Sequence, residues 1–220
     1  MVPRLVEAAT NLLAAVGPSE IKARSVAEAA GLSTTAVYYH IGGMPELLNA
    51  VVVEGFDQLE ASFARVSASE DPVADLMAMA ILFRGLAQRN PHLFDLMFGL
   101  STRGSYRHLK APSRGAQSQA FGRAFAHTVR ASARLATSGR IRAGHDPELV
   151  AAQLWSVVHG FITLELSNNF AVFGDPLTQI LLPVTVNVLT GMGDDTQRAH
   201  DSGKAGMRRA GAVDLAATVP

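Results

Sequence analysis

Apolar side chains recur every three to four positions along most of the chain, which is the spacing of one face of an α-helix. The first such stripe ends just before Gly17-Pro18, a pair that stops helices. It consists of Leu5, Ala9, Leu12, Leu13 and Val16. No segment alternates apolar and polar residues as a half-buried strand does, and Asn-Gly hairpin signals are absent. The pattern therefore predicts an all-α protein.

Proline and a preceding capping residue mark several of the later helix starts. One long helix runs from Leu47 to about Phe63, and further helices begin at Asp71-Pro72, Asn90-Pro91, Ser113, Asp146-Pro147 and Pro176. The last three are predicted to end near Ser138, Phe170 and Gly191. Residues 99–112 are polar and contain glycine, so we expect a loop there. Residues 193–220 mix charges with Gly, Ala and Thr without a period, which predicts a disordered tail.

Residues 24–41 read as two short helices joined by a glycine turn. Val26, Ala27 and Ala30 form the inner face of the first helix. Gly31 suits the left-handed backbone of a sharp corner, because it has no Cβ. Ser33 is a good N-cap for the second helix, which is predicted over residues 34–40.

The second short helix keeps Val37 and Ile41 for packing and shows polar side chains outward. The outward set is Thr34, Thr35, Tyr38, Tyr39 and His40. Hydroxyls, phenols and an imidazole on one exposed helix face suit contacts with the major groove of DNA. The segment therefore predicts a helix-turn-helix.

From Arg4 to about Phe56 the chain resembles the tetracycline-repressor (TetR) family of one-component regulators. The matched positions are Ala8-Ala9, Leu13, Gly17, Val26-Ala27, Ala30-Gly31-Leu32-Ser33, Val37-Tyr38-Tyr39-His40-Ile41 and Leu47-Leu48. The resemblance implies a three-helix DNA-binding domain in residues 1–46 and a larger domain for effector binding and dimerisation in residues 47–192. It also implies a double-stranded palindromic operator, a homodimer and a small-molecule effector as partners.

The same resemblance assigns the DNA contacts. Residues at Thr34, Thr35 and Ala36 would contact bases, and those at Tyr38 and His40 would contact phosphates. Arg24 stands where some members place an arginine that reads guanine. The complete predicted DNA-binding set is Lys22, Arg24, Ser33, Thr34, Thr35, Ala36, Tyr38, Tyr39 and His40. The plainer interpretation is that the aromatic side chains cap a surface helix and that Lys22 and Arg24 are merely solvated.

Charge is distributed unevenly, although the net charge is zero. Residues 4–60 hold three cations and seven acids, which sum to 3 − 7 = −4. The family usually has a lysine where this chain has Met44, so one phosphate contact is missing and DNA binding is expected to be weaker. The alternative is therefore a helical adaptor protein that no longer binds DNA. Residues 96–145 hold nine cations and no acid, either as a solvated arginine stripe or as a site for an anionic effector.

The two helices predicted from Pro147 and from Pro176 are apolar on nearly every side. One subunit of this size cannot cover both, so we expect them to pair with a second copy in a four-helix bundle. The predicted interface residues are Val158, Ile162, Leu166, Leu182 and Val186. Residues 155–166 also resemble the TetR subgroup whose C-terminal domain is named for a Trp-His-Gly signature.

Methionine and aromatic side chains supply the candidate effector pocket. They are Met79, Phe83, Met97, Phe98, Phe121, Phe125, Trp155 and His159. Such side chains make adaptable walls for an apolar or amphipathic ligand, with the histidine as a polar anchor. The alternative is that they are ordinary core residues.

Several other classes of protein are excluded by absent signals. The chain has no cysteine, and its histidines lack metal-ligand spacing, so neither a disulfide scaffold, a metal site nor another cofactor is expected. No nucleophile–base or carboxylate motif indicates a catalytic site. The first residues lack the apolar core of a signal peptide, and no stretch of eighteen residues is free of polar breaks, so the cytoplasm is the expected location and no membrane partner is expected.

Overall fold

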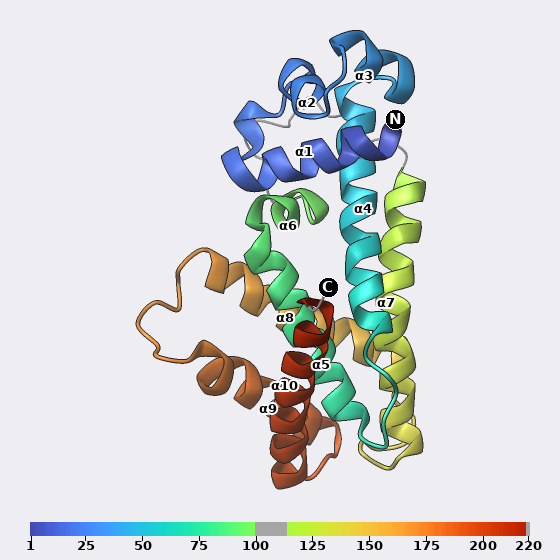
Figure 1. Ribbon diagram of the computed structural model, residues 1–220. Coiled ribbons are helices and arrows are strands. Elements are labelled where there is room, and N and C mark those ends of the chain that lie inside the picture. The colour runs from blue at the N-terminus through green and yellow to red at the C-terminus, as the bar shows by residue number, and fades with distance from the viewer. Residues whose placement is uncertain (100–113, 219–220) are drawn as a thin grey trace. The chain divides into compact units, whose positions relative to one another are not determined.

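The computed structural model describes residues 1–99 and 114–218, and within these ranges every regular element is a helix. The all-α prediction is therefore confirmed (Figure 1). The elements are α1 (Val2–Val16), η1 (Pro18–Glu20), α2 (Ala23–Ala29), α3 (Thr34–Ile41), α4 (Met44–Ala64), α5 (Pro72–Arg89), α6 (Pro91–Met97), α7 (Arg114–Thr137), α8 (Pro147–Leu166), η3 (Leu177–Leu181), α9 (Leu182–Met192) and α10 (Thr196–Thr218). Apart from Gly99, the loop predicted over residues 99–112 lies outside the described residues.

The chain forms two compact units. The first unit comprises Met1–Leu59 and Leu86–Arg123, and the second comprises Glu60–Gly85 and Ala124–Pro220. The boundary predicted between residues 46 and 47 falls inside α4, which contributes residues to both units. The compact units therefore do not follow the predicted division into residues 1–46 and 47–192.

In the first unit, α1 packs against α2, α3 and α6, and α2 packs against α3. Phe56 of α4 is buried here, with the ring of Phe98 at 5.6 Å and the ring of Phe121 at 5.7 Å between centroids, both edge-on. The preceding residue, Gly55, lets α6 approach closely, because a Cβ there would lie 2.7 Å from the sulfur of Met97. Because Gly55 has no side chain, the large side chain of Met97 can be buried against this part of α4.

The second unit is built around α5, whose residues from Pro72 to Ala80 are all buried. A helix that is apolar on every side must be surrounded by other elements. Phe63 and Phe83 are each 1% exposed here, and both lie against Trp155 of α8. Trp155 therefore stands at the centre of an aromatic cluster.

The predicted disordered tail was wrong, because residues 196–218 form α10, which packs against α9 (Figure 1). Its buried face carries small residues at helical spacing instead of large apolar ones. They are Ala199, Ser202, Gly203, Gly206 and Ala210. Hydropathy patterns detect helices by large apolar side chains, so a helix that packs through Gly and Ala escapes them.

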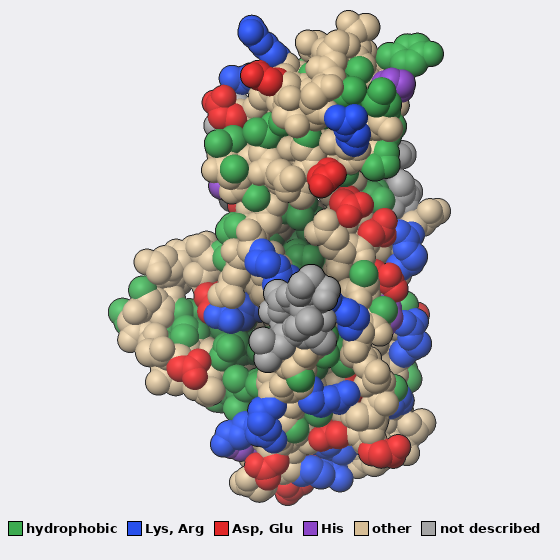
Figure 2. Space-filling model, viewed as in Figure 1, with side chains coloured by type: hydrophobic (Ala, Val, Ile, Leu, Met, Phe, Trp, Pro, Cys, Tyr) green, Lys and Arg blue, Asp and Glu red, His purple; other side chains and the backbone are tan. Residues whose placement is uncertain are grey.

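Buried ion pairs also hold α10 and the turn before it in the second unit. The Asp194 carboxylate accepts hydrogen bonds from Arg140 (Nε, 2.9 Å; Nη2, 2.7 Å) and from Arg198 (Nη2, 2.8 Å). Arg140 also donates to Asp71 at 2.8 Å and to Ser202 at 3.1 Å. In Figure 2, blue and red side chains intermingle over the part of the surface formed by α9 and α10. Ion pairs therefore attach α10 to the rest of the second unit.

Helix α8 ends at Leu166 and not near Phe170 as predicted. Asn168, two residues beyond this end, has a left-handed backbone (φ 60°), a conformation that asparagine tolerates better than most residues. The loop that follows carries Phe170 against Phe161, with 5.4 Å between ring centroids. Among the described helices, α8 alone is long and apolar enough to cross a membrane by length and composition, a test that core helices also pass.

Candidate functional site

A tight corner joins α2 to α3. Gly31 takes the left-handed conformation (φ 63°), as expected, and the N–H of Leu32 donates to the carbonyl of Ala27 at 2.8 Å. The guanidinium of Arg4 donates to the carbonyl of Ala30 at 2.7 Å and so satisfies a free acceptor at the end of α2. The corner is thereby fixed both locally and from α1.

Helix α3 presents its polar side chains to solvent. Ser33 caps it, because its Oγ accepts a hydrogen bond from the N–H of Ala36 at 3.3 Å. Val37 is fully buried, whereas Tyr38 and Tyr39 are 58% and 82% exposed. Thr34, Thr35 and His40 are exposed as well, and Ala36 is half-buried. Hydroxyl, phenol and imidazole groups are thus exposed together on the second helix of the turn, so this face is the candidate nucleic-acid interface.

Two cations lie at the start of α2. The helix begins at Ala23, with Lys22 as its N-cap, and Lys22 and Arg24 are both exposed. Ser25 accepts a hydrogen bond from the N–H of Lys22 at 3.1 Å, so it lies inside the first turn. Lys22 also lies 3.7 Å from Glu20 in an exposed ion pair.

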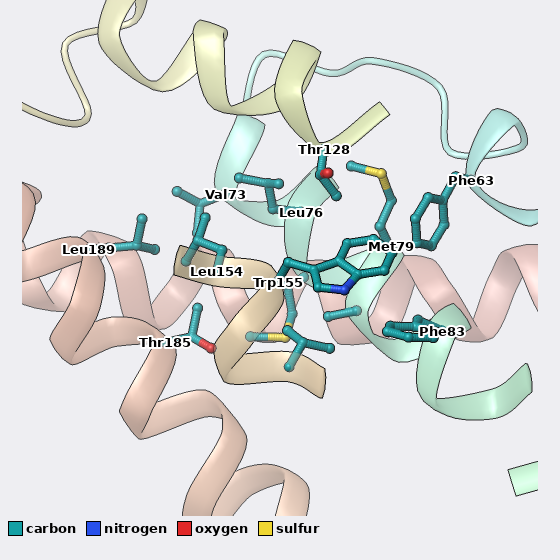
Figure 3. Close-up of a pocket in the computed structure, with 13 residues that line it drawn as sticks. Phe63, Val73, Leu76, Met79, Phe83, Thr128, Leu154, Trp155, Thr185 and Leu189 are labelled. Atoms are coloured by element: carbon teal, nitrogen blue, oxygen red, sulfur yellow. The ribbon is translucent and has the colours of Figure 1, made fainter. Parts of the chain in front are cut away.

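A small apolar cavity lies in the second unit between α5, α8 and neighbouring helices (Figure 3). Its volume is about 40 Å³, roughly the space of one or two water molecules. Thr128 and Thr185 supply its polar groups, and both hydroxyls donate to backbone carbonyls. Its lining comprises Phe63, Val73, Leu76, Met77, Met79, Ala80, Phe83, Thr128, Leu154, Trp155, Val158, Thr185 and Leu189. A ligand larger than water enters only if these walls move.

The structure separates the predicted pocket residues into two groups. Met79, Phe83 and Trp155 line the cavity. Phe125 packs edge-on against Trp155 (5.7 Å between centroids), and His159 lies 6.5 Å from the ring of Phe83. Burial lowers the pKa of His159 below its ordinary value of 6.5, so its imidazole is neutral at pH 7.

Met97, Phe98 and Phe121 belong to the first unit, so their prediction as pocket residues is corrected. Met97 packs on Gly55, and both phenylalanine rings pack on Phe56. Sequence reasoning missed the aliphatic lining residues such as Val73, Leu76 and Leu189, because nothing distinguishes them from other core residues.

Three of the predicted dimer-interface residues are core residues of one subunit. Ile162, Leu182 and Val186 are 0%, 2% and 6% exposed, and Leu182 packs on Gly203 of α10. Their prediction as interface residues is corrected, because all three are already buried within one subunit, Leu182 partly by α10, which was not expected. Val158 and Leu166 are half-buried.

A different face of α8 is open to solvent. Leu149 and Leu164 are 62% and 47% exposed, and only 28% of the most apolar part of this helix is buried. Between them, Gln153, Ser156 and Gly160 continue the strip at helical spacing, and a Cβ at Gly160 would meet nothing within 4 Å. We call Leu149, Gln153, Ser156, Gly160 and Leu164 the α8 strip.

Two parts of the chain match known domain families. Residues 5–51 match the family described as bacterial regulatory proteins, tetR family, and residues 76–182 match a tetracyclin repressor-like C-terminal domain. The proposed Trp-His-Gly subgroup is not tested by these matches and stays a prediction.

Named relatives point in the same direction. A stretch of 101 residues is 30% identical to the HTH-type transcriptional regulator Rv1816 of Mycobacterium tuberculosis, covering 44% of this chain and 42% of that protein. The chain thus matches less than half the length of this relative. An uncharacterised HTH-type transcriptional regulator of the same organism, Rv0681, is 23% identical over 163 residues, 74% of this chain and 69% of that protein.

Solved structures share the fold. A Rhodococcus protein of unknown function superposes with a TM-score of 0.72 at 24% identity, covering 88% of this chain and 95% of the other. RolR in complex with resorcinol gives a TM-score of 0.63 at 16% identity and covers 92% of both chains. SmeT, the repressor of a Stenotrophomonas maltophilia multidrug efflux pump, gives 0.56 at 22% identity, covering 87% of this chain and 88% of SmeT.

Proposed function

Because the chain belongs to the TetR family of bacterial regulatory proteins, we propose that it is a cytoplasmic repressor that a small-molecule ligand releases from a palindromic operator. The observation that carries the DNA-binding part is the exposed face of α3, held at a fixed corner by Gly31, Ser33 and Arg4. Thr34, Thr35 and Ala36 at the start of α3 read bases, as in other helix-turn-helix proteins. Tyr38 and His40 contact phosphates and set the register.

Substitutions in α3 should separate these two roles. Tyr38→Ala and His40→Ala are expected to weaken binding to all DNA sequences, because phosphate contacts position the protein. Thr34→Ala and Thr35→Ala should instead change base preference, by about 1–3 kcal/mol for each base pair affected. Fluorescence anisotropy with the intergenic DNA beside the protein's own gene, and with scrambled DNA, measures both.

Lys204→Ala is the matched control, since Lys204 is an exposed cation on α10. Unchanged operator affinity in all four α3 variants would show that α3 is not the recognition helix. If the wild-type protein itself fails to bind this DNA, the alternative of a helical adaptor is favoured over a repressor.

A homodimer supplies the two recognition helices that a palindromic site requires, spaced by about 34–36 Å. The α8 strip is the proposed contact. It is apolar at both ends, and the small residues at its centre permit close approach of a second helix. Leaving Leu149 and Leu164 in water would forfeit the free energy that their burial provides.

Leu164→Asp should therefore dissociate the dimer without unfolding the subunit, because Leu164 is exposed in the single chain. An unpaired carboxylate buried in an interface costs several kcal/mol. Sedimentation velocity at micromolar concentration measures the change, and circular dichroism checks the fold. Ser167→Asp, an exposed position just after α8, is the control. A wild-type protein that sediments as a monomer would contradict the proposed dimer.

The ligand part of the proposal rests on the cavity beside Trp155. Apolar and aromatic side chains line it, which suits an apolar or amphipathic molecule. Such a ligand would release DNA only if it binds the DNA-free conformation more tightly, and a tenfold shift needs about 1.4 kcal/mol of differential affinity. Trp155 is the sole tryptophan of the chain, so its fluorescence reports occupancy directly.

A further inference from the structure

A polar hollow lies beside the apolar cavity in the second unit. Its volume is about 200 Å³, several times that of the cavity. Three side chains of one face of α7 border it, namely His127, Arg130 and Arg134, together with Asp75 of α5. The three α7 residues are spaced by three and four positions, so they lie on one face of the helix and form one wall of the hollow. We call this space the cationic hollow.

Two side chains separate the cationic hollow from the apolar cavity. Phe63 of α4 and Met79 of α5 line both spaces, so they form a shared partition. Methionine has an unbranched, flexible side chain that adapts to different neighbours. Rotation of the Met79 side chain would therefore connect the two spaces without any movement of the backbone. The joined space is far larger than the apolar cavity alone.

Among the charged side chains that border the hollow, one cation has no carboxylate partner. Both oxygens of Asp75 are occupied, since Arg134 donates to one at 2.8 Å and the hydroxyl of Ser69 donates to the other at 2.7 Å. Arg209 donates to Asp75 as well. Although burial alone would raise the pKa of Asp75, the hydrogen bonds from Ser69, Arg134 and Arg209 lower it, so Asp75 is ionised and offsets one of the two positive charges of Arg134 and Arg209.

His127 is likewise engaged, because its Nε2 lies 3.0 Å from a carboxylate oxygen of Glu60. Arg130 is exposed, and among the described residues no carboxylate lies within ion-pair distance of it. A guanidinium that faces a hollow without a partner is suited to a carboxylate, which it can bind through two parallel hydrogen bonds. With His127 left aside, three arginines and the carboxylates of Glu60 and Asp75 sum to 3 − 2 = +1 around the hollow, which matches a singly charged anion better than a doubly charged phosphate.

We propose that movement of Met79 joins the cavity and the cationic hollow into one site for an amphipathic monocarboxylate. The hydrocarbon or aromatic body lies beside Trp155 and Phe83, and the carboxylate lies at Arg130. This inference rests on the proposed ligand-binding function and names the chemical class of the ligand. It also assigns a binding role to part of the arginine-rich stretch of α7.

Decanoate and decanol test this assignment, because they share a chain and differ in the head group. Titration of the full-length protein is followed by Trp155 fluorescence and by calorimetry. Decanoate is expected to bind up to about fivefold more tightly than decanol, the size of one ion pair at an exposed arginine. Arg130→Gln should remove this preference by weakening decanoate binding by the same factor while leaving decanol binding unchanged. Arg208→Gln, an exposed arginine on α10, is the control and should change neither.

Met79→Ala tests the partition separately. Shortening this side chain opens the wall in advance, so both ligands should bind more tightly to the variant than to the wild-type protein. Circular dichroism confirms that each variant is folded. Equal affinities of the wild-type protein and Arg130→Gln for decanoate would overturn the head-group assignment and leave the proposed ligand site intact. No binding of either molecule to the wild-type protein or to Met79→Ala would contradict the ligand site itself.

Discussion

Replacing Asp194 with alanine is expected to lower the free energy of unfolding by about 3–5 kcal/mol, the cost of leaving a buried charge without its partner. The Asp194 side chain is fully buried and that of Arg140 is 6% exposed. Without the carboxylate, Arg140 keeps its contact with Asp71, which has a side chain that is 36% exposed. That remaining contact places the expected loss toward the lower end of the range. Urea unfolding followed by circular dichroism measures the change.

Asp201→Ala removes an exposed carboxylate from α10, the helix that follows Asp194, and should change the free energy of unfolding by no more than about 0.5 kcal/mol. The pH dependence gives a second check. Burial alone would raise the pKa of Asp194, but hydrogen bonds from Arg140 and Arg198 outweigh it and lower the pKa below the ordinary value of 3.8. The stabilisation is therefore complete above that value and is lost as the pH falls through the depressed pKa. In Asp194→Asn, the free energy of unfolding should fall less as the pH is lowered. The same dependence on acidic pH in the variant and the wild-type protein would contradict this role of Asp194.

Gly206→Ala is the second substitution with a large expected effect, although it adds a single methyl group. The new Cβ would lie 2.6 Å from the Cβ of Met77 and closer still to the carbonyl oxygen of Ala74. Backbone atoms of α5 cannot rotate away, so α10 must shift. Overpacking of this kind costs about 1–3 kcal/mol. Thermal unfolding should show a lower midpoint for the variant.

Gly211→Ala on the same helix is the matched control. A Cβ at this exposed position meets nothing within 4 Å, so the substitution should stabilise the helix by up to about 1 kcal/mol. Met77 also lines the apolar cavity. Gly206→Ala is therefore expected to change ligand affinity as well, whereas Gly211→Ala is not. If both variants unfold at the same midpoint, α10 does not pack on α5 as described.

The helix-turn-helix could be predicted from the sequence because its signals are local. Gly31 determines the corner, Ser33 determines where α3 begins, and Gly17 ends α1. Each of these residues acts through its own backbone or through a neighbour three positions away. The starts of α5, α6 and α8 are local in the same sense, since each has a proline preceded by a capping side chain.

The packing of the larger elements could not be predicted in the same way, because it depends on partners distant in the sequence. Apolar character indicates that Phe121 and Phe125 are buried, but it does not indicate that the first packs on Phe56 and the second on Trp155. The error on Leu182 as an interface residue has an identifiable cause. Because α10 was not expected, Leu182 was assigned to contact with a second subunit, whereas it packs on Gly203 of the same chain.

The ion pairs of the second unit also limit when it can fold during synthesis. Asp75 is buried, yet its partners Arg134 and Arg209 are made 59 and 134 residues later. Until both have left the ribosome, closing α5 into a core would bury a carboxylate without its full set of donors. The second unit is therefore expected to complete its folding only after release of nearly the whole chain. The corner of α2 and α3, which depends on residues close in the sequence, is free to form much earlier.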